Sequence, residues 1–152
     1  MENNSTIHQI QPIGRLLALT GKSFLQVLNQ KLSYLDIERN YLALMLIELG
    51  EGNLTQKELA SQLETDKVSV VRVVDYLSLK GYVERVGSSI DRRKYCLTLT
   101  DKAKEVLPGI KKSMQETTAT AFEGLTELQQ AEFILALGQI KKNLSKVNNI
   151  GL

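Results

Sequence analysis

The sequence predicts a mainly α-helical protein with one small two-stranded β-ribbon, and three observations support this fold class. Residues 55–81 hold two short runs of apolar side chains at helical spacing, separated by a few polar residues. The spacing changes to strict alternation over 82–100. Longer helical patterns flank this centre at 13–33 and 126–147. We therefore expect three segments: an N-terminal helix in 1–35, a central lobe in 36–100 and C-terminal helices in 101–152.

The N-terminal third is expected to form two helices. The first runs from about Ile13 to Ser33, because apolar residues recur there at helical spacing. Those residues are Leu16, Leu17, Phe24, Leu28 and Leu32. Asp36 is expected to cap the second helix, which ends at the glycine-bounded turn 50–53. Its apolar residues are Leu42, Met45, Leu46 and Leu49. A short strand at 53–54 is expected to join the ribbon.

Residues 55–81 have the pattern of two helices joined by a tight turn. Thr55 and Glu58 form a capping box that begins the first helix, and Asp66 is a good N-cap for the second. The first helix buries Leu59, Ala60 and Leu63, and the second buries Val70, Val73, Val74 and Leu77. A valine-rich run can also form a strand, but the helical spacing between Asp66 and a capping Gly81 favours a helix. This is a helix-turn-helix, whose second helix enters the DNA major groove.

Alternation over 82–86 and 94–100 predicts two strands joined by a turn at Gly87-Ser88-Ser89. We expect Tyr95, Leu97 and Leu99 on one face of the second strand, opposite Cys96 and Thr98. The loop between the strands carries Asp91, Arg92, Arg93 and Lys94. A basic loop at the tip of such a ribbon is a wing, placed to reach the adjacent minor groove or the phosphate backbone. The fold class is thus mainly α with a small β-wing: a winged helix-turn-helix lobe plus a helical dimerisation lobe.

The C-terminal segment is expected to form two helices. Thr100 and Asp101 cap the first, which extends to about Ala121 and contains Pro108, a residue that should kink its axis. A second capping box, Thr126 with Gln129, opens the last helix. Its apolar residues alternate spacings of four and three, as in a coiled-coil seam: Phe133, Leu137, Ile140, Leu144 and Val147. This stripe must pack either within the chain or across a two-fold axis.

Composition narrows the class of protein. The net charge is only +2, but seven basic against four acidic residues place about +3 between Asp66 and Tyr95. No apolar run approaches the ~20 residues of a membrane span, and no signal peptide is evident. With a single cysteine, Cys96, a reducing cytoplasmic location is expected, without membrane association.

Residues 54–100 resemble the winged-helix core of MarR-family transcriptional regulators. The matching positions are Leu59-Ala60, Leu63, 66–75, Leu77, Lys80-Gly81, Val83-Glu84-Arg85, Asp91-Arg92-Arg93 and 97–102. The resemblance implies a homodimer on a palindromic duplex operator, more often a repressor than an activator, controlled by a small-molecule effector. Val68 and Val71 depart from the family pattern, because polar residues are common at those positions.

The expected DNA-binding residues lie on the helix-turn-helix and the wing. They are Thr55, Gln56, Lys67, Val68, Ser69, Val71, Arg72, Asp91, Arg92, Arg93 and Lys94. Arg72 either reaches a guanine edge or a phosphate, or pairs with neighbours such as Asp75. Val68 and Val71 either touch thymine methyl groups or pack against the preceding helix. Asp91 is expected to orient one wing arginine by an ion pair. The expected dimerisation residues are Leu16, Leu17, Phe133, Leu137, Ile140 and Leu144.

No pattern predicts catalysis, a cofactor or a metal site. The chain lacks a phosphate-binding glycine loop and a nucleophile set, and its one histidine, His8, has no ligand cluster around it. Aromatic residues make up only 5%, too few for a platform that stacks single-stranded bases. Two alternatives stay open. One is a thiol-based redox regulator acting through Cys96, although a structural thiol is favoured, and the other is a protein-interaction module without DNA binding.

Overall fold

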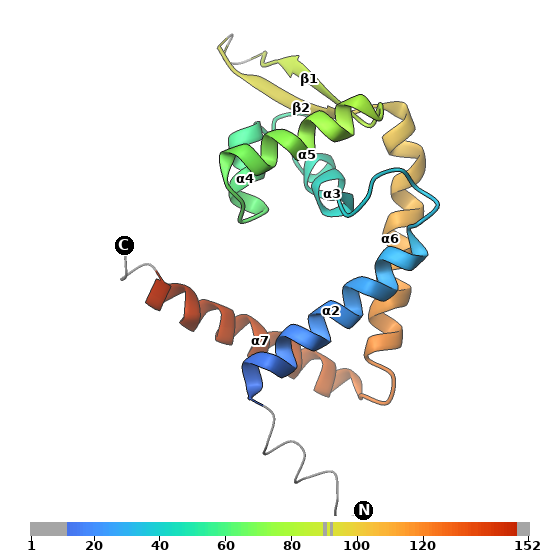
Figure 1. The fold of residues 1–152 in the computed structure, drawn as a ribbon, viewed down its shortest axis with the longest axis vertical. Helices are drawn as coiled ribbons and strands as arrows, with labels where there is room; N and C mark the ends of the chain where they lie inside the picture. Colours follow the sequence, from blue (N-terminus) through green and yellow to red (C-terminus); the bar gives the residue numbers. More distant parts are fainter. Residues whose placement is uncertain (1–11, 90, 92, 149–152) are drawn as a thin grey trace, which may run out of the picture. The chain divides into compact units, whose positions relative to one another are not determined.

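In a computed structural model, residues 12–89, 91 and 93–148 are described, and within them six helices accompany a two-stranded sheet (Figure 1). In chain order the elements are α2 (Ile13–Lys31), α3 (Tyr41–Leu49), α4 (Gln56–Gln62), α5 (Lys67–Leu79), β1 (Val83–Gly87), β2 (Tyr95–Leu99), α6 (Asp101–Ala121) and α7 (Glu127–Asn148). The chain divides into two compact units, Met1–Thr117 and Thr118–Leu152. The predicted fold class, mainly α with a small β-wing, is confirmed.

The connection between α2 and α3 differs from the prediction at Asp36. Helix α3 begins after Asn40, and Asp36 lies five residues before the first residue of the helix, so it does not cap it. Ile37 is fully buried and fixes this connection to the core. The Asp36 carboxylate instead accepts a hydrogen bond from the Tyr82 hydroxyl at 2.6 Å. A long-range partner has therefore displaced the local capping role.

The sheet is a single antiparallel hairpin. Val83 pairs with Leu99 at its base and Gly87 with Tyr95 near its tip. The expected strand at 53–54 is reduced to one bridge between Thr55 and Cys96, beside a bond from the Leu97 amide to the Leu54 carbonyl at 2.8 Å.

The burial of side chains along β2 departs from strict alternation at the start of the strand. Tyr95 is 66% exposed, whereas the neighbouring Cys96 and Leu97 are both buried. The 54–55 segment pairs with β2 on the edge opposite β1, so chain lies along both edges of Cys96 and Leu97. Cys96 and Leu97 lie on opposite faces of the strand and both are buried, so both faces are covered here, whereas burial alternates strictly only where one face is covered.

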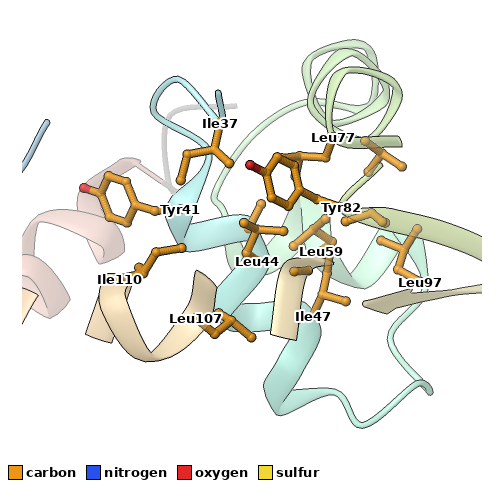
Figure 2. Packing of buried hydrophobic residues seen from close by; sticks show 14 of the residues in the cluster. Ile37, Tyr41, Leu44, Ile47, Leu59, Leu77, Tyr82, Leu97, Leu107 and Ile110 are labelled. Atoms are coloured by element: carbon orange, nitrogen blue, oxygen red, sulfur yellow. The ribbon is translucent and has the colours of Figure 1, made fainter. Parts of the chain in front are cut away.

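One hydrophobic core holds the winged lobe together (Figure 2). It receives the C-terminal end of α2, the buried faces of α3, α4 and α5, the base of the hairpin and the first half of α6. The largest fully buried side chains include Leu28, Ile37, Leu44, Ile47, Leu59, Leu77, Leu97, Leu107 and Ile110. Because α5 contributes Val70, Val74 and Leu77 to this core, its opposite face is presented outward.

Helices α6 and α7 begin and end close to the predicted residues. The Thr100 hydroxyl accepts from the Ala103 amide at 3.2 Å, and α6 reaches Ala121 with Pro108 inside it. The second capping box is formed, since Thr126 and Gln129 exchange bonds of 2.9 and 3.2 Å. Across the described residues, every helix falls short of the length and apolarity that crossing a bilayer requires.

Candidate nucleic-acid interface

Two side-chain caps fix the corner between α4 and α5. The Thr55 amide donates to the Glu58 carboxylate at 2.8 Å, and the Glu58 amide donates back to the Thr55 hydroxyl at 3.3 Å. The Asp66 carboxylate accepts from the amides of Val68 and Ser69 at 2.8 and 2.9 Å. Both caps were predicted from sequence, and both are confirmed. They set where the second helix of the motif begins.

The carboxylates of the two capping residues, Glu58 and Asp66, are ionised at neutral pH. Hydrogen bonds from the Ser69 hydroxyl and amide lower the pKa of Asp66. The Thr55 amide and hydroxyl lower the pKa of Glu58, with smaller contributions from the positive charges of Lys94 and Lys57. Bonds that favour a carboxylate's charged form lower its pKa in this way.

The outward face of α5 carries the side chains that sequence reasoning assigned to DNA. Lys67 and Arg72 are exposed, and Val68 is 61% exposed. Val71 is half-buried, and the Ser69 hydroxyl is occupied by the Asp66 carboxylate at 2.6 Å. Among the described residues Asp75 forms its ion pair with Arg85, and no pair joins it to Arg72. Within the described part of the chain, the guanidinium of Arg72 is therefore available to a ligand.

Arg85 of β1 joins the elements of this surface, and sequence reasoning missed it. Its Nη2 atom donates to Asp75 of α5 at 2.6 Å and to Gln56 of α4 at 3.1 Å. Gln56, predicted to touch DNA, is thus engaged in holding the motif. No local spacing predicts this contact, because the three residues come from three elements. We infer a positioning role for Arg85.

Asp91 braces the wing through contacts with the two described residues that follow it. The Asp91 carboxylate accepts from the Arg93 amide at 3.0 Å and pairs with Lys94 at 3.8 Å. Lys94 is thus the ion-pair partner of Asp91 among the described residues, and the predicted ion pair with a wing arginine stays a prediction, since Arg92 is outside them. The hairpin is closed by the Ser88 amide bonding to the Lys94 carbonyl at 2.8 Å. Arg93 is exposed, and Arg92 lies outside the described residues.

A shallow groove along α4 connects the helix-turn-helix to the wing. Its two adjoining parts share Gln56, Lys57 and Ser61. One part is also lined by Lys94 and the other by Lys67. Three ammonium groups on one open groove attract an anionic polymer such as a phosphate backbone. Lys57 was not predicted as a site residue, although its position two residues after the Thr55 cap was a usable signal.

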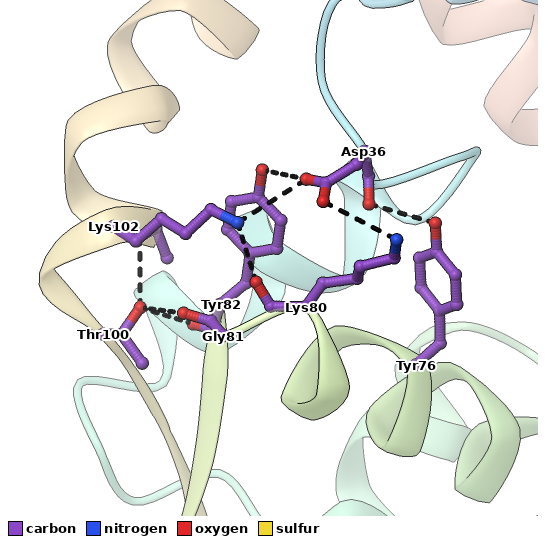
Figure 3. Close-up of polar contacts among 8 residues, drawn as sticks. Asp36, Tyr76, Lys80, Gly81, Tyr82, Thr100 and Lys102 are labelled. Carbon is purple, nitrogen blue, oxygen red and sulfur yellow. Dashed lines mark hydrogen bonds and ion pairs between the residues drawn. The ribbon is translucent and has the colours of Figure 1, made fainter.

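A polar cluster fastens the far end of α5 (Figure 3). The Tyr76 hydroxyl donates to the Asp36 backbone carbonyl at 3.0 Å, while Lys80 and Lys102 lie 3.7 and 3.6 Å from the Asp36 carboxylate. The Lys102 ammonium also sits 4.1 Å from the centre of the Tyr82 ring. The cluster ties α5 to the α2–α3 connection and to the start of α6.

The Tyr82–Asp36 bond shifts both groups. Burial, the hydrogen bond and the negative charge of Asp36 raise the pKa of Tyr82 to about 12. The same hydrogen bond, assisted by Lys102 and Lys80, lowers the pKa of Asp36. The phenol stays protonated and the carboxylate stays charged at neutral pH.

Cys96 is buried, and its thiol lies 3.6 Å from the Asn53 carbonyl oxygen. A covered thiol is poorly reached by an oxidant, which favours the structural interpretation. In the described ranges, no group of three His, Cys, Asp or Glu side chains is placed to hold a metal ion.

Comparison with known proteins agrees with this geometry. The sequence profile of the MarR family matches residues 38–94. A solved MarR transcriptional regulator from Methanosarcina mazei Go1 aligns with a TM-score of 0.78 and 26% identity, over 89% of this chain and 97% of its own. The chain is therefore similar to the MarR family, in sequence over this segment and in fold over most of its length. The family resemblance that the motif spacing indicated is thereby confirmed.

Two further relatives bear on the activity of this protein. A mutant MarR from E. coli, solved in complex with operator DNA, aligns with a TM-score of 0.78 and 27% identity, over 87% of this chain and 95% of its own. YybA of Bacillus subtilis, an uncharacterized HTH-type transcriptional regulator, is 23% identical over 133 residues, which are 87% of this chain and 88% of YybA. The protein is a transcriptional regulator similar to those of the MarR family, and it is not an enzyme.

Proposed function

We propose that this protein is a homodimeric repressor that binds a palindromic duplex operator in the cytoplasm and is released by a small-molecule effector. One observation carries the DNA-binding part of the proposal. The exposed side of the motif gathers Lys57, Lys67, Arg72, Arg93 and Lys94 around α4, the start of α5 and the wing. A duplex backbone requires such a row of cations, spaced along one face.

The proposed contacts divide by role. Lys67 and Arg72 of α5 enter the major groove, and Arg93 of the wing reaches the minor groove or backbone. Thr55, Lys57 and Lys94 line the groove that would follow a phosphate strand. Asp91 shapes the wing, and Gln56 acts through Arg85. These assignments extend the predicted DNA-binding set, in which Val68, Ser69, Val71 and Arg92 also stand.

Apolar side chains on α2 and α7 support the homodimer. On α7, Phe133, Leu137, Ile140 and Leu144 are between 39% and 59% exposed. On α2, Leu16 is 36% exposed, while Leu17 is half-buried. Stripes of this kind at helical spacing are normally buried against a partner. A second copy would cover them and set two recognition helices about one DNA turn apart, ~34 Å.

A polar groove beside α2 supports effector control. Two adjoining depressions there share Asn29, Ser33 and Arg39, and one of them also contains Lys22. Among the described residues, the depression with Lys22 and Arg39 has no acidic side chain in its lining and suits an acidic or phenolic ligand, whereas the other also contains Asp36 and Glu38. Binding would shift the equilibrium between two dimer geometries with different spacings of the recognition helices.

The decisive experiment measures DNA affinity against salt for a duplex selected by the protein. We expect log Kd to depend steeply on log salt, and Arg93→Ala to reduce the slope by about one per subunit, because one phosphate contact is lost. Lys112→Ala, an exposed lysine in the middle of α6, is the charge-matched control and should leave the slope unchanged.

Two results would reject parts of this proposal. A flat salt response by folded protein would favour the protein-interaction module instead. Repeating the assay with phenolic and acidic ligands tests effector control, and an unchanged affinity across the series would argue against it.

A further inference from the structure

The outward stripe of α5 combines one cation with exposed apolar side chains. Val68, Arg72, Asp75 and Leu79 follow one another at spacings of three or four, so they share one face of the helix. Val68 is 61% exposed and Leu79 is 84% exposed. The face that would meet DNA therefore begins with a bare isopropyl group.

Polar groups near Val68 already have partners inside the protein. The Ser69 hydroxyl is bound to Asp66 at 2.6 Å, and the Val68 amide is bound to the same carboxylate at 2.8 Å. One turn further on, Asp75 is bound by Arg85 at 2.6 Å. In the described part of this stripe, Val68 offers methyl groups and Arg72 offers donors, and the other polar groups are occupied.

Folding does not explain a valine at this position. Valine is a poorer helix former than alanine, because its β-branch restricts χ1. At Val70 and Val74, burial in the core offsets this cost, since the two side chains are 1% and 0% exposed. Val68 is 61% exposed, so burial offsets little of this cost in the free protein. An apolar partner in the complex would supply what the fold does not.

We propose that Val68 is a specificity-determining residue that recognises a methyl group on a pyrimidine edge in the major groove. In unmodified DNA that group is the C5-methyl of thymine, since cytosine carries only hydrogen there. The N-terminal residues of a recognition helix are the ones that contact base edges. Arg72, one turn along, would then read a guanine or hold a phosphate of the same half-site. This inference rests on the proposed DNA-binding function and adds the chemistry by which one position is read.

Deoxyuridine tests the inference, because it removes the thymine methyl and keeps every hydrogen-bonding group. In the duplex selected by the wild-type protein, each thymine is replaced singly by deoxyuridine and the affinity is measured. We expect one thymine in each half-site at which affinity falls roughly fourfold, the worth of one buried methyl group. Replacing both symmetric thymines should cost roughly fifteenfold. With cytosine at that position, 5-methylcytosine should restore about fourfold of affinity.

Two variants test whether Val68 is the residue that senses the thymine methyl group. Val68→Ala should bind thymine and deoxyuridine duplexes equally, while its melting temperature stays at or above the wild-type value because alanine favours the helix. Leu79→Ala is the matched control, because it removes an exposed apolar side chain about 16 Å along the same helix. This variant should keep the wild-type discrimination.

The outcomes separate this inference from the function on which it rests. Specific binding with no thymine sensitive to deoxyuridine would overturn the role of Val68 and leave the regulator intact. Discrimination that persists in Val68→Ala would assign the methyl contact elsewhere. Absence of any selected duplex would overturn both proposals.

Discussion

Asp36 lies on an exposed turn, yet its carboxylate collects a tyrosine hydroxyl and two ammonium groups from other parts of the winged lobe (Figure 3). The bond from Tyr82 is the shortest of these contacts, and Tyr82 itself is buried. A hydrogen bond to a charged acceptor beside a covered ring is a contact whose loss should be measurable.

Replacing Tyr82 by phenylalanine should lower the free energy of unfolding by about 1 kcal/mol at neutral pH, because it removes this bond and keeps the ring. The pKa of Tyr82 is raised from 10.0 to about 12, so the contribution is complete below pH 10 and is lost as the pH rises toward 12. Urea titrations of both proteins between pH 8 and pH 12 measure the difference.

At acidic pH the same contact loses its contribution to stability as the pH falls, because the carboxylate becomes protonated. The pKa of Asp36 is lowered, so its contribution is complete above the ordinary value of 3.8 and is lost as the pH falls below that value. The Asp36→Asn variant controls for the charge. A difference between wild type and Tyr82→Phe that stays constant from pH 10 to 12 would show that the folded protein does not bias the ionisation of this phenol.

Caps within one turn were predictable, and long-range polar contacts were not. Thr55 and Asp66 reach amides two or three residues away, so their spacing in the sequence identifies them. The Tyr82–Asp36 bond joins residues 46 positions apart, and Arg85 reaches Gln56 across 29. Such partners follow from packing, which no periodicity records.

At the level of elements, Gly81 ends the recognition helix with a backbone that disfavours side chains. Its φ is +75°, although a Cβ placed there would meet no atom within 4 Å. Any cost of substitution is therefore conformational and not steric.

Gly81→Ala should lower the free energy of unfolding by about 1 kcal/mol, the usual cost of a left-handed residue with a Cβ. Gly87→Ala is the control, because its Cβ would also meet nothing and its φ lies outside the left-handed range. That variant should stay within about 0.5 kcal/mol of wild type in the same urea titration. Equal losses in the two variants would refute the conformational argument.

The periodic elements followed from the sequence because each has a local signal. The ends of α2, α5, α6 and α7 carry caps, glycine or proline, and the structure places them within about two residues of the prediction. The burial of Cys96 did not follow, because its thiol contact is with the Asn53 carbonyl, on the other side of two helices in sequence. The kink expected at Pro108 stays a prediction.

At the scale of the whole molecule, the proposed homodimer would cover the exposed apolar stripe of α7. Leu137 and Ile140 stand at its centre, 39% and 40% exposed. A charge at either position would be expensive to bury in an interface and harmless on a solvated helix.

Ile140→Glu should convert the protein from a species of twice 17.0 kDa to one of 17.0 kDa and weaken operator binding at least tenfold. Sedimentation equilibrium measures the mass. Leu49→Glu is the control, since Leu49 is 73% exposed on α3 and is absent from the proposed dimer set. A wild-type protein of single-chain mass would contradict the dimer directly.

The internal cap of α5 has a consequence for how the regulator would find its operator. Asp66 occupies the amides of Val68 and Ser69, groups that a helix N-terminus could otherwise direct at a phosphate. Non-specific DNA binding would then come from long, mobile lysine and arginine side chains, which can move from one phosphate to the next with little reorganisation of the protein. Binding of this kind favours rapid one-dimensional sliding along the duplex. The residence time of the protein on DNA would then be long only at a site whose bases it recognises.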